Sequence, residues 1–180
     1  MGGNSDKTSG GTRNYASQPG TLGKRQGEFN RLMGTGNYDK SNSYMDKSGG
    51  FVVVHNERKY NENELEAGKK LAKKGYKVYL DRERSTVSGQ TAKDGRLYQS
   101  PMDIKAIKTP GKWTLKSAMD YASKQGAETV VVLQRSSSVT REYITNQINL
   151  FREHSPQRAK EKIKRVIVIG MDGSVHRRPV

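Results

Sequence analysis

Residues 101–107 read PMDIKAI, and the rest of the chain is interpreted outward from this stretch. Its apolar residues alternate with charged ones, a pattern typical of a β-strand. Side chains two positions apart in a strand point to the same side, so Asp103 and Lys105 share one face. Ile104 and Ala106 then face the opposite side, into packing. A charged pair in an otherwise apolar strand is costly unless it has a partner or a function, although an isolated triplet of this kind also fits a surface salt pair.

The residues on either side of this strand predict alternating strands and helices. We expect a single strand within 96–108, bent or at a sheet edge at Pro101. Apolar runs and helical spacing predict the remaining elements: strands over 51–55, 77–83, 128–134 and 164–170, helices over 61–76, 114–125 and 137–154, and a loop over 85–95. This order predicts an α/β fold with one central mixed β-sheet flanked by helices.

Composition divides the chain at about residue 50. Residues 1–50 hold 11 of the 19 glycines and contain no Val or Ile. Such a stretch buries too little apolar surface to offset its chain entropy. We therefore expect residues 1–50 to be a disordered Gly/Ser/Asn-rich tail or linker and residues 51–180 to form the folded domain.

The charge points to a polyanionic partner. The chain carries 33 Lys and Arg against 18 Asp and Glu, a net charge of +15 over 180 residues. Residues 51–180 contribute +12 of this, from 26 basic and 14 acidic residues. Nucleic acid and an acidic membrane face are the two partner classes that such a charge favours. No apolar run approaches the roughly 20 residues of a membrane span, so we expect a soluble protein.

The absence of cysteine narrows the chemistry. It excludes disulfides, cysteine-based zinc fingers and thiol nucleophiles. Cleavage of a phosphodiester at neutral pH then most simply uses Mg²⁺ held by carboxylates, with a nearby lysine to stabilise charge on the phosphate. The sequence should therefore offer two or three acids that converge beside one lysine.

Two further acids are placed to join Asp103 and Lys105. Asp94 precedes Gly95, where a hairpin would bring it back beside Asp103. A turn-forming Asp-Gly pair is an equally good reading of Asp94. Glu64 lies in the preceding helix, at the edge of its buried face.

In order and spacing, these stretches resemble the PD-(D/E)xK nuclease superfamily, and more closely the C-terminal nuclease domains of contact-dependent growth inhibition toxins and related phage-borne or polymorphic toxins. The resemblance covers about residues 51–176. It is carried by NELEAGKKLAKKGYKVYL (63–80), AKDG (92–95), MDIKAI (102–107), KSAMDYASKQGAETVVVL (116–133) and KRVIVIGMDGSV (164–175). It implies a restriction-endonuclease-like core.

The resemblance also implies roles for individual residues. Glu64, Asp94 and Asp103 would be catalytic carboxylates and ligands of one or two Mg²⁺ or Mn²⁺ ions, with Zn²⁺ as an alternative, and Lys105 would be the catalytic lysine. The sequence departs from the family pattern at Lys93, where a proline usually precedes the first Asp. Glu66 is the rival of Glu64, but it points about 200° away around the helix, which favours Glu64.

Substrate contacts are expected around this centre. In proteins of this type the helix after the D-x-K strand lies beside the active site, which implies contacts from Lys112, Lys116 and Gln125. The basic terminal residues Arg177 and Arg178 fit contacts with a phosphate backbone. We expect Trp113 to pack the helix against the sheet.

These observations predict a metal-dependent endonuclease that cuts tRNA or DNA, with RNA slightly favoured. It would be an antibacterial toxin domain that acts in a target cell's cytoplasm after delivery within a larger secreted or phage-borne protein, neutralised by an acidic immunity protein. Two alternatives stay open: a non-catalytic nucleic-acid-binding accessory protein of a phage or mobile element, and a metal-independent ribonuclease. The latter would use a histidine, of which the chain has three: His55, His154 and His176.

Overall fold

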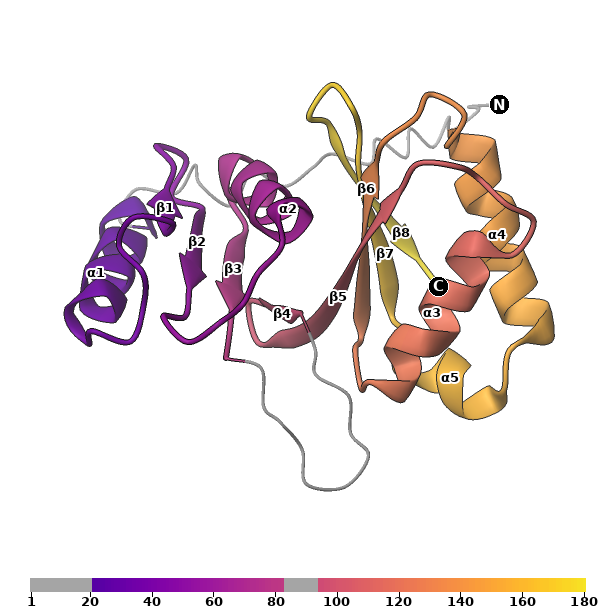
Figure 1. Cartoon of the computed structure of the whole chain (residues 1–180), viewed down its shortest axis with the longest axis horizontal. Coiled ribbons are helices and arrows are strands. Elements are labelled where there is room, and N and C mark those ends of the chain that lie inside the picture. The colour runs from indigo at the N-terminus through magenta and orange to yellow at the C-terminus, as the bar shows by residue number, and fades with distance from the viewer. Residues whose placement is uncertain (1–20, 83–93) are drawn as a thin grey trace, which may run out of the picture.

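The computed structural model describes residues 21–82 and 94–180, and in these ranges the chain forms one mixed β-sheet with helices packed around it (Figure 1). The eight strands lie in the sheet in the order in which they occur in the sequence. They are β1 (Tyr44–Met45), β2 (Phe51–Val54), β3 (Lys77–Leu80), β4 (Gly95–Leu97), β5 (Ser100–Ile107), β6 (Thr129–Gln134), β7 (Arg165–Ile169) and β8 (Val175–Pro179). The helices are α1 (Thr21–Gly34), α2 (Glu62–Lys73), α3 (Thr114–Lys124), α4 (Arg141–His154) and α5 (Gln157–Lys162).

Strand direction follows the length of each connection. The strands joined through helices pair in parallel, namely β2 with β3, β5 with β6, and β6 with β7. Those joined by short turns or loops pair antiparallel, as do β1 with β2, β4 with β5, and β7 with β8. The strand β3 also pairs antiparallel with β4. The predicted α/β class and helix-flanked mixed sheet are confirmed, and a PD-(D/E)xK core stays a prediction.

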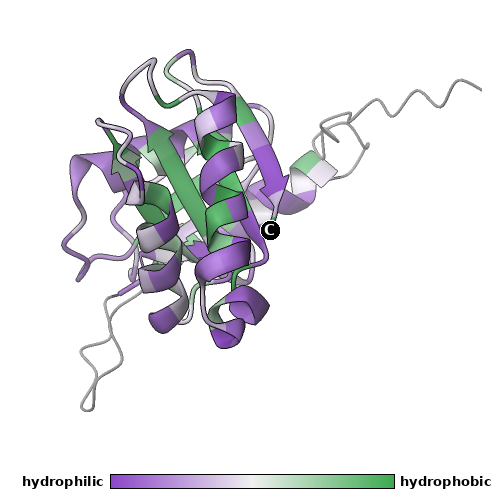
Figure 2. Ribbon diagram, turned by 90° about the vertical axis from the view of Figure 1, so that its right-hand side faces the viewer, coloured by the Kyte–Doolittle hydropathy of each residue, from purple (hydrophilic) through white to green (hydrophobic). Residues whose placement is uncertain are grey.

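The two faces of the sheet carry separate apolar clusters. Under α2, Leu71 packs with Ile104 of β5 and Val131 of β6. On the other face, Val130 and Val132 of β6 pack against α3, α4 and α5. Figure 2 shows apolar strands lying behind helices whose outer surfaces are polar. Alternate residues of β5 therefore face different helices, and this separation decides the geometry of the candidate site.

Residues 21–50, expected to be part of a disordered tail, instead form α1 and β1. Phe29, Leu32 and Met33 pack against a third cluster made of Phe51, Val53 and Tyr79. Three glycines weaken the intrinsic helix preference of residues 21–34, so the helix depends on this packing rather than on local propensity. Residues 1–20 of the expected tail lie outside the described residues.

The single strand expected within 96–108 is a hairpin, with β4 and β5 joined at Tyr98 and Gln99. Tyr98 has a φ of +55°, a conformation usually adopted by Gly or Asn in such turns. The sequence has neither residue there, so the turn gave no local signal. Gly95 allows the close approach to β3, since a Cβ at this position would lie 2.2 Å from the carbonyl oxygen of Tyr79.

The other expected helices and strands are present, with shifted ends, and most of the loop expected over 85–95 lies outside the described residues. The helix expected from residue 137 begins at Arg141, because the Thr140 side chain caps it by accepting a hydrogen bond from the Tyr143 N–H. The helix α5 and the strand β8 were not expected. Within residues 21–82 and 94–180, the helices are too short or too polar to cross a bilayer.

Candidate active site

Asp103 and Lys105 lie on the β5 face that α3 covers. Lys105 Nζ is 3.1 Å from Asp103 Oδ2 and 5.3 Å from the centre of the Tyr121 ring of α3. Ile104, between them, points to the opposite face and packs under α2. The strand alternation predicted for PMDIKAI is therefore present, and it holds a carboxylate and an ammonium group side by side in the interior of a sheet.

Asp103 is a buried carboxylate, with 1% of its surface exposed. Burial, followed by the negative charge of Asp94, raises the pKa of Asp103 from its ordinary value to about 7. The positive charge of Lys105 opposes this rise but does not cancel it. Asp103 Oδ2 has no hydrogen-bond partner and only the ion pair with Lys105. A carboxyl group with this pKa exchanges its proton near neutral pH, which suits general acid–base chemistry.

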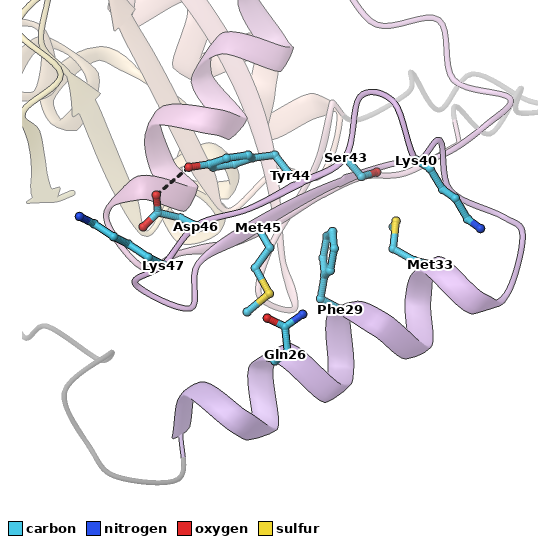
Figure 3. A pocket seen from close by; sticks show the side chains of 9 residues that line it. All are labelled: Gln26, Phe29, Met33, Lys40, Ser43, Tyr44, Met45, Asp46 and Lys47. Carbon is cyan, nitrogen blue, oxygen red and sulfur yellow. Dashed lines mark hydrogen bonds between the residues drawn. The ribbon is translucent and has the colours of Figure 1, made fainter.

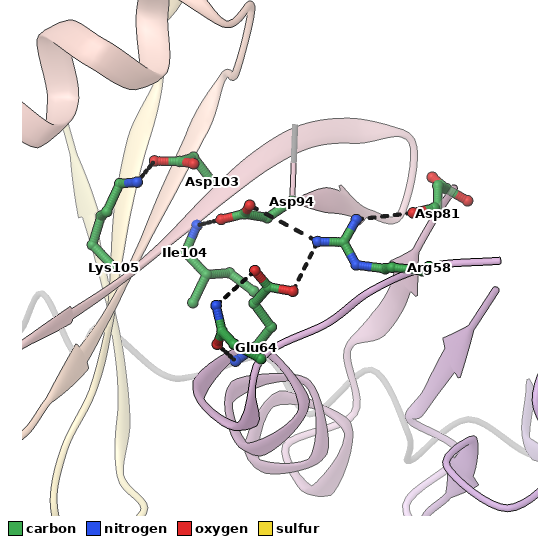
Figure 4. Close-up of polar contacts among 8 residues, drawn as sticks. Arg58, Glu64, Asp81, Asp94, Asp103, Ile104 and Lys105 are labelled. Atoms are coloured by element: carbon green, nitrogen blue, oxygen red, sulfur yellow. Dashed lines mark hydrogen bonds and ion pairs between the residues drawn. The ribbon is translucent and has the colours of Figure 1, made fainter. Parts of the chain in front are cut away.

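Asp94 lies immediately before β4 begins, opposite the part of β5 that β4 does not pair with. Its Oδ2 accepts a hydrogen bond from the Ile104 backbone N–H at 2.7 Å (Figure 4). It is also close enough to Asp103 for its negative charge to raise the pKa of the Asp103 carboxyl group. A hairpin thus brings Asp94 back beside Asp103, but its turn is at Tyr98 and Gln99 rather than at Gly95, which belongs to β4. Asp94 therefore has a structural role beyond a turn, because its side chain accepts the hydrogen bond that the Ile104 N–H would otherwise donate to a neighbouring strand.

Arg58, which the sequence did not single out, connects Asp94 with Glu64. Its buried guanidinium donates through Nη2 to Glu64 Oε2 at 2.8 Å and lies 3.8 Å from Asp94 Oδ1. Its Nη1 donates to the backbone carbonyl of Asp81 at the end of β3. Figure 4 shows the arginine beside both carboxylates, with a dashed line to each. Arg58 comes from a loop before α2, where an arginine is ordinarily exposed, so no local pattern indicated its burial.

Glu64 is buried at the start of α2, and both of its carboxylate oxygens are used. Oε2 accepts from Arg58, and Oε1 accepts from Asn61 Nδ2 at 3.0 Å. Asn61 in turn caps the helix by accepting from the Glu64 N–H. Burial raises the pKa of Glu64, and the Arg58 hydrogen bond and charge only partly offset the rise.

The rival residue Glu66 points elsewhere. It forms a two-pronged ion pair with Arg135, with nitrogen–oxygen distances of 3.1 and 2.5 Å, and a further pair with Lys70. These contacts lower the pKa of Glu66, chiefly through the Arg135 hydrogen bond. The structure therefore places Glu64, rather than Glu66, next to Asp94.

These positions fit a divalent cation only in part. Asp94 and Asp103 are adjacent, and the orphaned Oδ2 of Asp103 is a suitable oxygen donor. Glu64 lies on the α2 side of the sheet and is already neutralised by Arg58. Among the residues that the structure describes, no three acidic or histidine side chains are grouped closely enough to hold a metal. Asp94 and Asp103 are thus the pair that would bind Mg²⁺ or Mn²⁺, and Glu64 is joined to them through Arg58.

The expected substrate-binding residues divide into two groups. Lys112 precedes α3, and Lys116 lies in its first turn, where its Nζ pairs with Asp120 Oδ2 at 2.6 Å. Gln125 ends the same helix, and its buried Oε1 has no hydrogen-bond partner. Arg177 and Arg178 lie on β8, three strands away from β5, about 14 Å at the usual spacing between strands.

Trp113 corrects an expectation. Instead of packing α3 onto the sheet it is 40% exposed, and its ring meets His154 edge-on at 5.8 Å. The helix is anchored by Leu115 and Met119, which are buried two and six residues after Trp113. A tryptophan at a helix start resembles an anchor in sequence, but here the two aliphatic residues fill the core.

A separate pocket of about 590 Å³ lies between α1 and residues 40–47 (Figure 3). Phe29 and Met33 of α1 and Met45 of β1 provide its apolar walls. Tyr44 donates a hydrogen bond to Asp46 at 2.7 Å on the opposite side. This pocket is at the β1 end of the sheet, away from Asp103, and none of the expected site residues lines it.

Comparison with known proteins identifies a related fold. No protein-family model and no curated protein sequence matches the chain. Among solved structures, a chain of the CdiA-CT/CdiI toxin and immunity complex from Burkholderia pseudomallei matches with a TM-score of 0.52 at 20% sequence identity. The match covers 72% of this chain and 98% of that chain. At this identity the likeness shows a common fold.

Proposed function

We propose that this chain is a nuclease toxin domain that hydrolyses phosphodiester bonds, with Asp103, Lys105 and Asp94 as its active-site residues. The observation that carries the proposal is the buried Asp103, paired with Lys105 and adjacent to Asp94 in a chain of net charge +15. Burying a carboxylate at this cost without a function would be unusual. The net positive charge of the chain favours binding of a polyanionic substrate.

The chain's own residues divide the chemistry between them. Asp103, with a pKa of about 7, takes or gives a proton near neutral pH. Lys105 places an ammonium beside it, where it stabilises negative charge that develops on a phosphate. Asp94 keeps the pKa of Asp103 high through its own charge. Mg²⁺ or Mn²⁺ held by Asp94 and Asp103 would lower the pKa of both carboxyl groups and supply Lewis-acid activation of water, and in that state the ion, rather than a proton on Asp103, would assist the reaction.

The toxin assignment is supported by the fold. The matching chain belongs to a complex described as toxin and immunity protein. A toxin of this kind requires a neutralising partner in the cell that makes it. We propose an acidic immunity protein that covers the basic surface around α3, because opposite charges accelerate such association. Delivery into a target cell within a larger protein follows from the same proposal.

The substrate is proposed to be nucleic acid, with tRNA slightly favoured over DNA. The test is to incubate the purified full chain with total tRNA and with supercoiled plasmid, each in Mg²⁺, Mn²⁺ and EDTA. Cleavage of either substrate in divalent metal, lost in EDTA, is the expected result. Tight binding with no cleavage under any condition would instead favour a non-catalytic binding protein, and EDTA-resistant RNA cleavage would favour a metal-independent ribonuclease.

Matched variants assign the cleavage to the site. Asp103→Asn and Lys105→Ala are each expected to lower the rate by about 100-fold or more. Asp172→Asn, in the exposed turn before β8, and Lys69→Ala, on the exposed face of α2, are the controls of the same chemical type. Equal losses in the controls would show that the effect is not local to Asp103 and Lys105.

A further inference from the structure

The helix α3 presents two exposed aromatic rings on its outer side. Trp113, at the N-cap, is 40% exposed, and Tyr121 is 48% exposed. Eight residues of helix separate them, about 12 Å along the axis. The other large hydrophobic side chains exposed among the described residues, Leu22 and Met171, are aliphatic and lie on separate elements. Each ring therefore has a face that a planar ligand can contact.

Each ring has lysine ammonium groups close to it. Lys112 Nζ and Lys116 Nζ are 5.4 and 6.0 Å from the centre of the Trp113 ring. Lys105 Nζ is 5.3 Å from the centre of the Tyr121 ring. Aromatic rings that stack on bases, interleaved with cations that pair with phosphates, are the two components of a surface for unpaired nucleic acid.

The backbone beneath Trp113 is held in place by α4. Buried Gln147 accepts a hydrogen bond from the Lys116 N–H at 3.1 Å and donates to the Lys112 carbonyl at 2.8 Å. The Tyr143 hydroxyl donates to the Gly111 carbonyl at 3.0 Å. The start of α3 is therefore fixed before any ligand arrives, which lowers the ordering cost of binding.

Lys105 joins this surface to the candidate active site. Its ammonium group lies over Tyr121 and also contacts Asp103 Oδ2 at 3.1 Å. A strand of nucleic acid lying on Tyr121 would thus have a phosphate within reach of Lys105, whose ammonium group pairs with the buried Asp103. Lys105 therefore connects the Tyr121 end of α3 with the candidate active site.

We propose that α3 binds unpaired nucleotides, with bases stacked on Trp113 and Tyr121 and phosphates contacted by Lys105, Lys112 and Lys116. The inference rests on the proposed nuclease function and narrows its substrate to single strands or unpaired loops. In a duplex the faces of the bases are already covered by neighbouring bases, so Trp113 and Tyr121 could not stack on them.

Trp113 is the only tryptophan of the chain, so its fluorescence reports directly on this surface. The full chain carrying Asp103→Asn, in EDTA, is titrated with a 12-nucleotide unpaired RNA, the matching DNA, and the duplex of each. Binding is followed in parallel by anisotropy of a labelled strand. Unpaired strands are expected to quench Trp113 and to bind about tenfold more tightly than duplexes. The RNA and DNA arms show which sugar is preferred.

Variants in the same background test the second ring. Tyr121→Leu is expected to weaken binding of the unpaired strand about tenfold, whereas Tyr121→Phe and the distant control Met171→Ala retain it. The inference is overturned if anisotropy shows binding while Trp113 emission does not change. It is also overturned if the duplex binds with the same affinity as the unpaired strand. Neither of these two results bears on whether the unmutated chain cleaves nucleic acid. If unpaired strands quench Trp113 but the unmutated chain cleaves no substrate, the nuclease proposal is overturned and the proposed stacking surface is retained.

Discussion

At the scale of single residues, Asp103 links the candidate chemistry to the stability of the fold. Its pKa is about 7 in the folded chain, against an ordinary value of 3.8. Between those two values the folded state binds more protons than the unfolded chain. The free energy of unfolding therefore falls as pH rises from about 4 to 7, and it stays low above that range.

Asp103→Asn should remove this dependence. In EDTA, we expect the variant to be more stable than the unmutated protein at pH 8, by on the order of 2–4 kcal/mol, with the gain disappearing towards pH 4. Urea unfolding across this pH range measures it. Asp172→Asn is the control, because hydrogen bonds from Ser174 lower the pKa of Asp172 and its loss should bring no gain at pH 8. A stability difference between Asp103→Asn and the unmutated chain that does not vary with pH would contradict the assignment.

Arg58 and Glu64 form a buried pair whose members should depend on each other. Arg58→Met leaves Glu64 buried and unpaired, which should cost on the order of 3 kcal/mol, whereas Arg58→Met combined with Glu64→Leu should recover most of the loss. Urea unfolding of the single and double variants gives the coupling free energy. The exposed pair Arg82–Glu57 is the control, expected to couple by less than about 1 kcal/mol. Additive losses at Arg58 and Glu64 would show that the pair is not energetically coupled.

The site residues that the sequence indicated are those with a local pattern. Strand alternation placed Asp103 beside Lys105, and the position of Glu64 at the helix edge matches its burial. Arg58 had no such pattern, because its environment is assembled from α2, the end of β3 and Asp94. Their roles in catalysis stay predictions.

At the scale of secondary-structure elements, α1 is attached to the rest of the molecule by polar contacts as well as apolar packing. Arg25 is buried and donates to the carbonyls of Gly75 and Gly49. Glu28 accepts from the Tyr79 hydroxyl at 2.6 Å and pairs with Lys77. Burial opposes ionisation of Glu28, but these hydrogen bonds outweigh it and lower its pKa.

Arg25→Met should therefore loosen α1. We expect a loss of about 2 kcal/mol in the free energy of unfolding, because two buried carbonyl groups lose a charged donor. Lys24→Met, one residue earlier and exposed, is the matched control and should change stability by less than about 0.5 kcal/mol. Equal effects of the two substitutions would mean that the Arg25 contacts do not hold the helix.

Whether an element could be predicted depended on where its stability originates. The helix α2 was predictable, since Asn61 caps it and its buried residues recur at helical spacing. The helix α1 was not, because its stability depends on the apolar surface of Phe51, Val53 and Tyr79, which only the folded sheet presents. The strand β8 was missed for a related reason: as an edge strand it exposes His176 and Arg177 and lacks an apolar run.

At the scale of the whole molecule, the charge of +15 predicts binding that is sensitive to salt. The affinity for nucleic acid should fall steeply between 50 and 200 mM salt, by orders of magnitude if several phosphates are contacted. Lys116→Ala should reduce the slope of log affinity against log salt by about one, whereas Lys69→Ala on α2 should leave it unchanged. Anisotropy titrations measure both, and affinity independent of salt would contradict a phosphate-binding surface.

The central claim is that Asp103 lies at the centre of a nuclease site, and one comparison tests it most directly. The unmutated chain and Asp103→Asn, at equal concentration and both shown to be folded by Trp113 emission, are mixed with total tRNA and supercoiled plasmid in Mg²⁺. The initial cleavage rates are then read from gels. We predict cleavage of at least one substrate by the unmutated chain and a rate lower by about 100-fold or more for the variant. Equal rates for the two proteins, or no cleavage by either, would contradict the claim.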